Sequence, residues 1–168
     1  MRSDPSSPVV TYANDHVAFR VTDIEQSTRF FIEAFGATIL TNPFVLEGDF
    51  AEAMMEGPPG VRWRMRHLGL DRGVVELFEF LEPVVAARPQ HGTTGTVLHA
   101  GFQVSDVDAV ADRVVAAGGR LIIPVTQWGP WRLTFIADLD GNVIELADGS
   151  IRDLIYSTIE AFPNARPN

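Results

Sequence analysis

The sequence predicts an α+β fold: two tandem βαβββ modules that form a U-shaped, half-open mixed β-barrel with helices outside. The main observation is an internal repeat. Residues 16–40 match residues 99–123 with seven identities in 25 ungapped positions, where about one or two are expected by chance. In each copy the hydrophobic period also changes from two residues to a helical spacing at the same point, which indicates a strand followed by a helix.

Each module is expected to begin with a strand that has two different faces. In residues 16–21 the odd-numbered side chains are apolar and share one face, which leaves His16 on the other. Residues 99–104 repeat this alternation and begin with His99.

A helix is expected to follow each of these strands. Asp23 and Asp106 have the side chain that caps a helix amino end. The apolar spacing then continues to a glycine, a common helix terminator, and predicts helices over residues 24–36 and 107–119.

Three further strands complete each module. We expect them at residues 38–40, 61–70 and 73–81, and at 121–123, 131–138 and 142–148. The final strands align, "DRGVVEL" on "DGNVIEL", and this alignment places Glu76 on Glu145. The first module carries about 14 extra residues, and its insert "TNPFVLEGDFAEAMMEGPPG" is interpreted as a lid or substrate loop.

Composition places the boundaries between these parts. Proline, glycine and serine cluster outside the modules, as is typical of loops. The predicted division is a leader at 1–11, module one at 12–82, a linker at 83–95, module two at 96–149, and a C-terminal helix and tail at 150–168.

The overall composition excludes several classes of partner. A formal net charge of −9 disfavours nucleic-acid binding, which needs a basic surface. No apolar run approaches the roughly 20 residues of a membrane helix. The absence of cysteine excludes disulfides and thiolate metal sites and fits a cytoplasmic protein.

Strand parity predicts a metal site. Because side chains alternate along a strand, four of them are expected on the face away from the helices: His16, Glu76, His99 and Glu145. Two imidazoles and two carboxylates that converge in an apolar cavity are suited to a divalent cation, and Zn, Ni, Co, Mn and Fe all accept such ligands. Without a cation, buried carboxylates would be costly.

The segments "HVAFRVTDIEQSTRFF" and "DLDGNVIEL", in paired βαβββ copies, resemble the vicinal oxygen chelate superfamily. The resemblance covers residues 12–149. This superfamily includes glyoxalase I, methylmalonyl-CoA epimerase, extradiol dioxygenases, and the fosfomycin and bleomycin resistance proteins. The resemblance implies that its metal-ligand positions fall on the same four residues.

The ligand set implied by this resemblance favours non-redox chemistry. The resemblance implies that extradiol dioxygenases and fosfomycin enzymes hold their metal with two His and one Glu. Glyoxalase I has a further Glu ligand at the position that Glu76 occupies here. The leading hypothesis is therefore a glyoxalase-like lyase or isomerase, which acts on a small oxygenated substrate through a metal-chelated enediolate. Glu145 would transfer the proton, with Glu76 as its pseudo-symmetric partner. The alternatives are an Fe(II)-dependent extradiol-type dioxygenase and a metal-free drug-binding resistance protein.

Further residues are candidates for contacts with a small-molecule substrate. They are Arg20, Gln103, Phe78, Phe80, Arg64 and Trp131. Arg64 belongs to the alternating series "RWRMR", which could hold an anionic group if its face were the concave one. A homodimer is expected, because half-open barrels leave exposed edges.

Overall fold

The computed structural model describes residues 15–54, 58–84 and 97–161 of the 168-residue chain. The predicted leader at 1–11 and most of the predicted linker at 83–95 lie outside these residues.

Within the described residues, each module contributes one mixed five-stranded sheet. The first module contains β1 (His16–Val21), α1 (Ile24–Phe35), β2 (Thr38–Ile39), β3 (Phe44–Leu46), α2 (Asp49–Met54), β4 (Arg62–Gly69) and β5 (Val74–Glu82). The second contains β6 (Ala100–Gln103), α3 (Val107–Ala116), β7 (Arg120–Leu121), β8 (Thr126–Trp128), β9 (Trp131–Ala137) and β10 (Val143–Ala147), and is followed by α4 (Ile151–Ala161).

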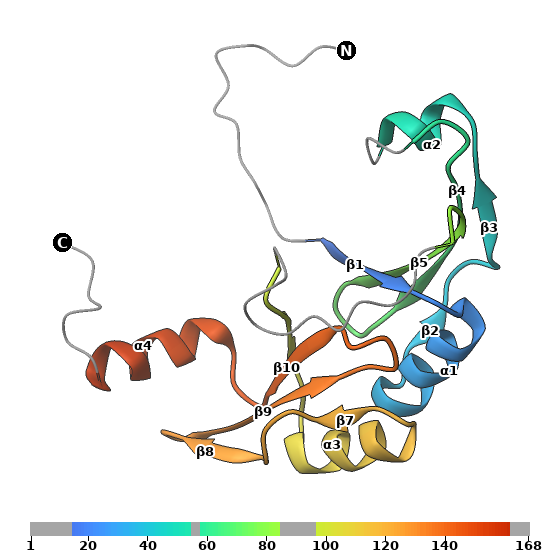
Figure 1. Ribbon diagram of the computed structural model, residues 1–168. Coiled ribbons are helices and arrows are strands. Elements are labelled where there is room, and N and C mark those ends of the chain that lie inside the picture. The colour runs from blue at the N-terminus through green and yellow to red at the C-terminus, as the bar shows by residue number, and fades with distance from the viewer. Residues whose placement is uncertain (1–14, 55–57, 85–96, 162–168) are drawn as a thin grey trace, which may run out of the picture.

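The two sheets have the same topology. Their strand orders are β1-β5-β4-β2 and β6-β10-β9-β7, and β3 and β8 pair with β4 and β9 at matching places. The first strand of each module is parallel to its last, and the other pairings are antiparallel. The predicted fold class, two βαβββ modules with mixed sheets that do not close, is confirmed (Figure 1).

The helices begin at the predicted caps. The Asp23 carboxylate accepts hydrogen bonds from the backbone N–H groups of Glu25 and Gln26, and Asp106 accepts one from Ala109. Because such a side chain satisfies free N–H groups at the helix start, both caps stabilise their helices.

The helices end differently from one another. Gly36 closes α1 in the left-handed conformation at φ 68°, whereas in the second module Gly118 has the positive φ, at 93°. Gly119, which aligns with Gly36 in the sequence repeat, is required for space. A Cβ at that position would lie 2.8 Å from the Phe30 ring and 2.9 Å from the Ala137 carbonyl oxygen.

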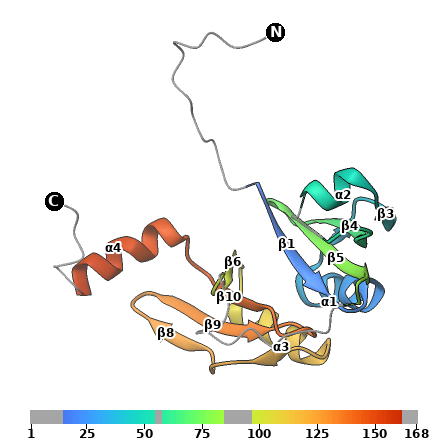
Figure 2. The same cartoon turned by 45° about the horizontal axis from the view of Figure 1, so that its top comes forward.

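The modules pack together through their helix-covered faces. A single core contains apolar side chains of α1 and the first sheet together with those of α3 and the second sheet. Phe35 and Phe102 meet edge to face across the junction, with ring centroids 5.3 Å apart. Since the helix-covered faces share this core, each sheet keeps an open face that turns away from the other module (Figure 2).

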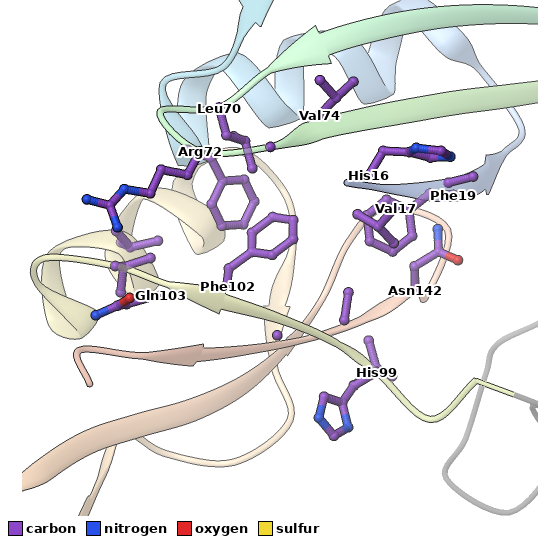
Figure 3. Close-up of a pocket in the computed structure, with 18 of the residues that line it drawn as sticks. His16, Val17, Phe19, Leu70, Arg72, Val74, His99, Phe102, Gln103 and Asn142 are labelled. Atoms are coloured by element: carbon purple, nitrogen blue, oxygen red, sulfur yellow. The ribbon is translucent and has the colours of Figure 1, made fainter. Parts of the chain in front are cut away.

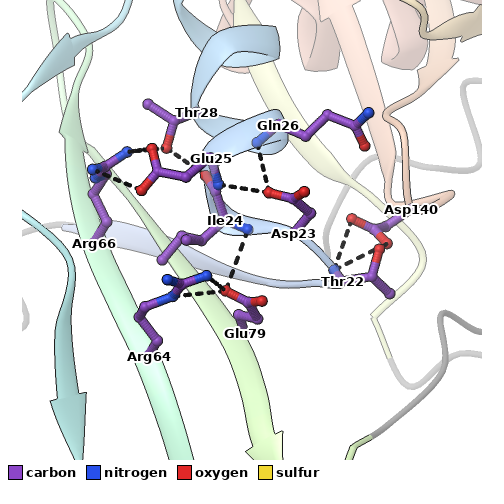
Figure 4. Close-up of polar contacts among 10 residues, drawn as sticks. All are labelled: Thr22, Asp23, Ile24, Glu25, Gln26, Thr28, Arg64, Arg66, Glu79 and Asp140. Carbon is purple, nitrogen blue, oxygen red and sulfur yellow. Dashed lines mark hydrogen bonds and ion pairs between the residues drawn. The ribbon is translucent and has the colours of Figure 1, made fainter.

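The loop between β9 and β10 joins the modules with polar contacts. Asp140 accepts hydrogen bonds from the Thr22 hydroxyl at 2.6 Å and from the Thr22 backbone N–H (Figure 4). Asn142 donates to the Arg20 carbonyl oxygen at 3.1 Å. The "DGN" turn of the second module therefore holds the end of β1 in place.

Three short elements were not specified by the sequence pattern. β3 and α2 lie in the insert of the first module, and β8 lies in the shorter second connection. Ala51 of α2 packs with Trp63 and Phe78 in a second core, so the insert covers part of the open face of the first sheet.

The predicted C-terminal helix is present as α4, which extends away from the sheets in both views (Figures 1 and 2). In the described part of the chain, no helix is long and apolar enough to cross a membrane.

Candidate metal centre

The open face of each sheet carries one of the predicted His/Glu pairs. In the first sheet Glu76 of β5 lies opposite Ala18 of β1, and in the second Glu145 of β10 lies opposite Gly101 of β6. Because residues two apart share a strand face, Glu76 is on the same face as His16, the first residue of β1. His99 directly precedes β6 and contacts Glu145 on the matching face. The predicted parity is therefore observed in both modules.

The first pair is open to solvent at the imidazole and more covered at the carboxylate. His16 Nε2 lies 3.6 Å from Glu76 Oε2, and the side chains are 49% and 18% exposed. On the other side of the His16 ring, Nδ1 lies 3.6 Å from an Asp15 carboxylate oxygen.

The second pair is closer. His99 Nε2 lies 3.0 Å from Glu145 Oε2, and the His99 ring packs edge to face against Phe135 at 5.2 Å. A cavity of 470 Å³ opens beside this pair, and the start of α4 at Ile151 and Arg152 forms part of its wall.

Within one chain the two pairs do not meet. In Figure 3 the His16 and His99 rings lie apart, on the two sides of the space between β1 and β6 that Phe102 enters. A cavity of 1210 Å³ lies between these strands. Among the described residues, no three His, Asp or Glu side chains cluster closely enough to hold a metal ion. In the described part of the single chain, the two His/Glu pairs are therefore separate half-sites.

The other predicted substrate contacts are distributed over several surfaces. Arg20 and Gln103 line the cavity between the modules. Trp131 shares the Glu145 face and packs so closely against Gly149 that a Cβ there would overlap its ring. Phe78 and Phe80 share the Glu76 face but pack with Trp63 in the second core.

The condition for anion binding by Arg64, that its face be the concave one, is not met. Arg64 lies opposite Glu79 on the helix-covered side of the first sheet, and its Nε donates to Glu79 Oε2 at 2.8 Å. Arg66 of the same series is buried and donates to Glu25 and Thr28 of α1 (Figure 4). These arginines compensate carboxylates beside α1, which leaves them unavailable to a ligand on the open face.

Sequence reasoning missed His67. His67 lies on β4, directly opposite Glu76 of β5. Its Nε2 is 3.1 Å from Glu76 Oε1 and its Nδ1 is 3.1 Å from the Thr41 hydroxyl. The hairpin "HLGLDRGVVE" contains the signal, because a tight turn at Asp71–Gly73 sets this register.

One ionisable side chain near the module junction has an altered pKa. Burial raises the pKa of Asp138 to about 6, although hydrogen bonds from Asn142 and from the Asp140 backbone oppose this increase. Asp138 organises the β9–β10 turn: Oδ1 accepts from the Asn142 backbone N–H at 2.8 Å and Oδ2 accepts from its side-chain amide at 2.8 Å.

The fold and the repeated His/Glu pairs define a protein of paired βαβββ modules. The family model described as "Glyoxalase/Bleomycin resistance protein/Dioxygenase superfamily" matches residues 14–146, and the chain belongs to this superfamily. The predicted resemblance to the vicinal oxygen chelate proteins is confirmed. Among curated proteins, no sequence matches the chain.

Solved structures of low sequence identity share the fold. A glyoxalase family protein from Bacillus cereus is 23% identical, with a TM-score of 0.72 over 86% of this chain and 97% of that one. A glyoxylase/bleomycin resistance protein/dioxygenase domain from Frankia sp. is 19% identical, with a TM-score of 0.65 over 84% and 100%. A mutant of the fosfomycin resistance protein FosX from Listeria monocytogenes, complexed with Mn(II) and 1S,2S-dihydroxypropylphosphonic acid, is 16% identical, with a TM-score of 0.60 over 91% and 99%.

Proposed function

We propose that this protein is a metal-dependent, glyoxalase-like lyase or isomerase that moves a proton on a small oxygenated substrate. The observation that carries the proposal is the pair of matched half-sites, His16 with Glu76 and His99 with Glu145, on equivalent open faces. The superfamily contains enzymes, and a FosX neighbour was crystallised with Mn(II).

The spacing within each pair suits two ligands of one cation. Ligand atoms that lie about 2.1 Å from a metal are about 3.0 Å apart at a right angle and about 3.4 Å apart in a tetrahedron. The nitrogen–oxygen separations of 3.6 Å and 3.0 Å are close to these values. Imidazole and carboxylate donors suit Zn, Ni, Co, Mn or Fe.

A homodimer would complete the centre. Since the two half-sites of one chain are separate, a second copy related by twofold symmetry can place its second module against the first module of its partner. The twofold symmetry then forms two equivalent metal centres in the dimer. Two features support this arrangement. In the described sheets, β1 and β6 each pair on one side alone, and edge strands tend to be covered. Leu98, beside His99, is 58% exposed.

The residues would divide the chemistry between them. A divalent cation supplies Lewis acidity that stabilises negative charge on substrate oxygens. His16, Glu76, His99 and Glu145 would hold it, and Glu145, as a mobile ligand, would remove a proton from the carbon beside the substrate carbonyl and return it to a neighbouring atom. Arg20, Gln103 and Trp131 lie on or beside the open faces and are the residues that we propose contact the substrate.

A solvent-exchange experiment tests this function and does not require that the product be identified. The metal-loaded protein is incubated in D₂O with a panel of small 2-hydroxy and 2-oxo carbonyl compounds, and ¹H NMR follows loss of the proton beside the carbonyl. We expect exchange with at least one compound, and at least a hundredfold slower exchange in Glu145→Gln, because general bases contribute about 10²–10⁴-fold. Metal content of E145Q is measured in parallel and should persist in part.

Oxygen dependence separates this function from the dioxygenase alternative. Proton transfer needs no oxygen, so the exchange rate should be the same in air and under anaerobic conditions. Turnover that stops without oxygen would instead indicate a dioxygenase. A metal-free protein that binds the compounds without exchange would indicate a binding protein.

A further inference from the structure

The two glutamates of the proposed centre have different neighbours although the modules repeat. Across the antiparallel pairing, Glu76 lies opposite His67, whereas Glu145 lies opposite Phe135. Both glutamate side chains are 18% exposed, so burial does not distinguish them. What distinguishes them is the chemistry of the facing residue.

His67 donates a hydrogen bond to Glu76. Its Nε2 is 3.1 Å from Glu76 Oε1, while His16 is nearer the other carboxylate oxygen, at 3.6 Å from Oε2. An ionised carboxylate accepts hydrogen bonds and cannot donate them, so Nε2 of His67 must carry the proton. In the neutral ring Nδ1 is then an acceptor, and the Thr41 hydroxyl, 3.1 Å away, is its donor.

The His67 ring is itself held by several contacts. The Thr41 hydroxyl oxygen accepts the His67 backbone N–H at 3.0 Å, so this one hydroxyl fixes both the strand and the ring. Phe44 of the insert stacks on the ring, with centroids 5.9 Å apart and planes inclined by 20°. The longer connection of the first module supplies this support.

The surroundings of Glu145 restrain it less. Phe135 offers no donor, and within the described residues the ion pair of the Glu145 carboxylate is the one with His99. A cation held between His99 and Glu145 would replace their direct contact, and Phe135 has no donor to hold the carboxylate in place as His67 does for Glu76.

We propose that His67 is a positioning residue that fixes Glu76 as a stationary carboxylate ligand, and that Phe135 at the equivalent place leaves Glu145 free to move the proton. This inference rests on the proposed metal-dependent function and assigns unequal roles to its two glutamates. The pseudo-symmetry of the modules is broken by one residue opposite each glutamate, His67 or Phe135. Mutation of a residue that hydrogen-bonds to a metal ligand typically weakens metal binding by about 10–100-fold.

The test compares three variants by Co²⁺ titration, followed by visible absorption. His67→Phe keeps a ring against Phe44 but removes both nitrogens, and we expect about 10–100-fold weaker Co²⁺ binding with an altered spectrum. His67→Gln keeps an amide donor that can reach Glu76, and it should recover affinity to within about threefold of wild type. Thr41→Val removes the group that orients the ring and should weaken binding several-fold while it retains the fold.

The outcomes separate this inference from the proposed function. Wild-type protein that binds no Co²⁺ overturns the proposed function and the inference with it. If wild type binds and H67F and T41V bind equally well, the function stands and the role of His67 is overturned. Equal loss in H67F and H67Q would also overturn it, since the effect would then come from the ring and not from the donor. Should H67F fail to fold, T41V and H67Q still decide the question.

Discussion

At the scale of single residues, the local surroundings decide what an ionisable side chain does. On the open faces, as far as the structure describes them, Glu76 contacts two imidazoles, from His16 and His67, whereas Glu145 contacts one. Asp138 is a different case, since it is 6% exposed and is held inside a turn. Its pKa is raised to about 6 because burial disfavours the charged form.

This raised pKa predicts a pH dependence of stability. A carboxyl group that binds its proton more tightly in the folded state stabilises the protein below its ordinary pKa of 3.8, and this contribution is lost as the pH rises through about 6. Asp138→Asn keeps the shape and removes the ionisation. Between pH 4 and 7 we expect the free energy of unfolding of D138N to rise relative to wild type, by up to about 3 kcal/mol at ~1.4 kcal/mol per pH unit.

Urea denaturation of both proteins at several pH values measures this difference. The Asn142 amide must turn to face the new side chain, which adds a difference independent of pH. The slope of the difference against pH is therefore the informative quantity, and a flat difference between pH 4 and 7 would contradict the prediction.

At the scale of elements, the sequence predicted most helices and strands because each carries its own signal. Capping aspartates, amphipathic spacing and the repeat all agree for α1 and α3, and each structural boundary lies within a few residues of its prediction. β3, α2 and β8 carry no comparable signal. They are three to six residues long, and β3 and β8 are held in place by pairing with β4 and β9.

Pairing between elements also explains the missed and the misplaced site residues. His67 faces Glu76 because of the register of the β4–β5 hairpin, and Arg64 faces α1 because it lies an odd number of residues from His67. Once the face of one β4 residue was known, the alternation of side chains along the strand would have placed Arg64 on the helix-covered face and excluded it as a substrate contact. That face is decided by contact with the neighbouring strand, which the isolated segment does not contain.

Gly119 gives a prediction at the junction between elements. Gly119→Ala would place a Cβ 2.8 Å from Phe30 of α1 and 2.9 Å from the Ala137 carbonyl oxygen. Because the backbone of β9 cannot move freely, we expect a loss of about 1–3 kcal/mol in the free energy of unfolding. Gly101→Ala is the matched control, since no heavy atom lies within 4 Å of its Cβ position. Equal stability of G119A and G101A would show that the junction is looser than the structure indicates.

At the scale of the whole molecule, the orientation of the modules determines where a metal centre can form. The helix-covered faces share one core, and the half-sites are separate within the described part of one chain. If a twofold dimer completes the centre, each site takes His16 from one subunit and His99 from the other.

This arrangement predicts complementation between inactive variants. His16→Ala and His99→Ala should each abolish high-affinity metal binding. After the two proteins are mixed and allowed to exchange subunits, half of the dimers are mixed, and each mixed dimer contains one site with both histidines. The expected metal content is about a quarter of wild type, measured by elemental analysis after removal of loosely bound metal.

The control is H16A taken alone through the same exchange, which should remain without metal. Native mass spectrometry of the mixture confirms that mixed dimers form. Mixed dimers without metal would contradict a shared centre and favour sites that are completed within one chain.

The sequence by itself determined the paired modules, the helix caps and the two His/Glu pairs, because these depend on short-range periodicity and on a repeat that can be counted. Tertiary structure decided three further points: the place of His67 beside Glu76, the position of Arg64 on the helix-covered side of its sheet, and the separation of the two half-sites within the described part of one chain. Each depends on strand register or helix packing between segments far apart in the chain. Such contacts follow from how whole faces fit together, and no single segment encodes them.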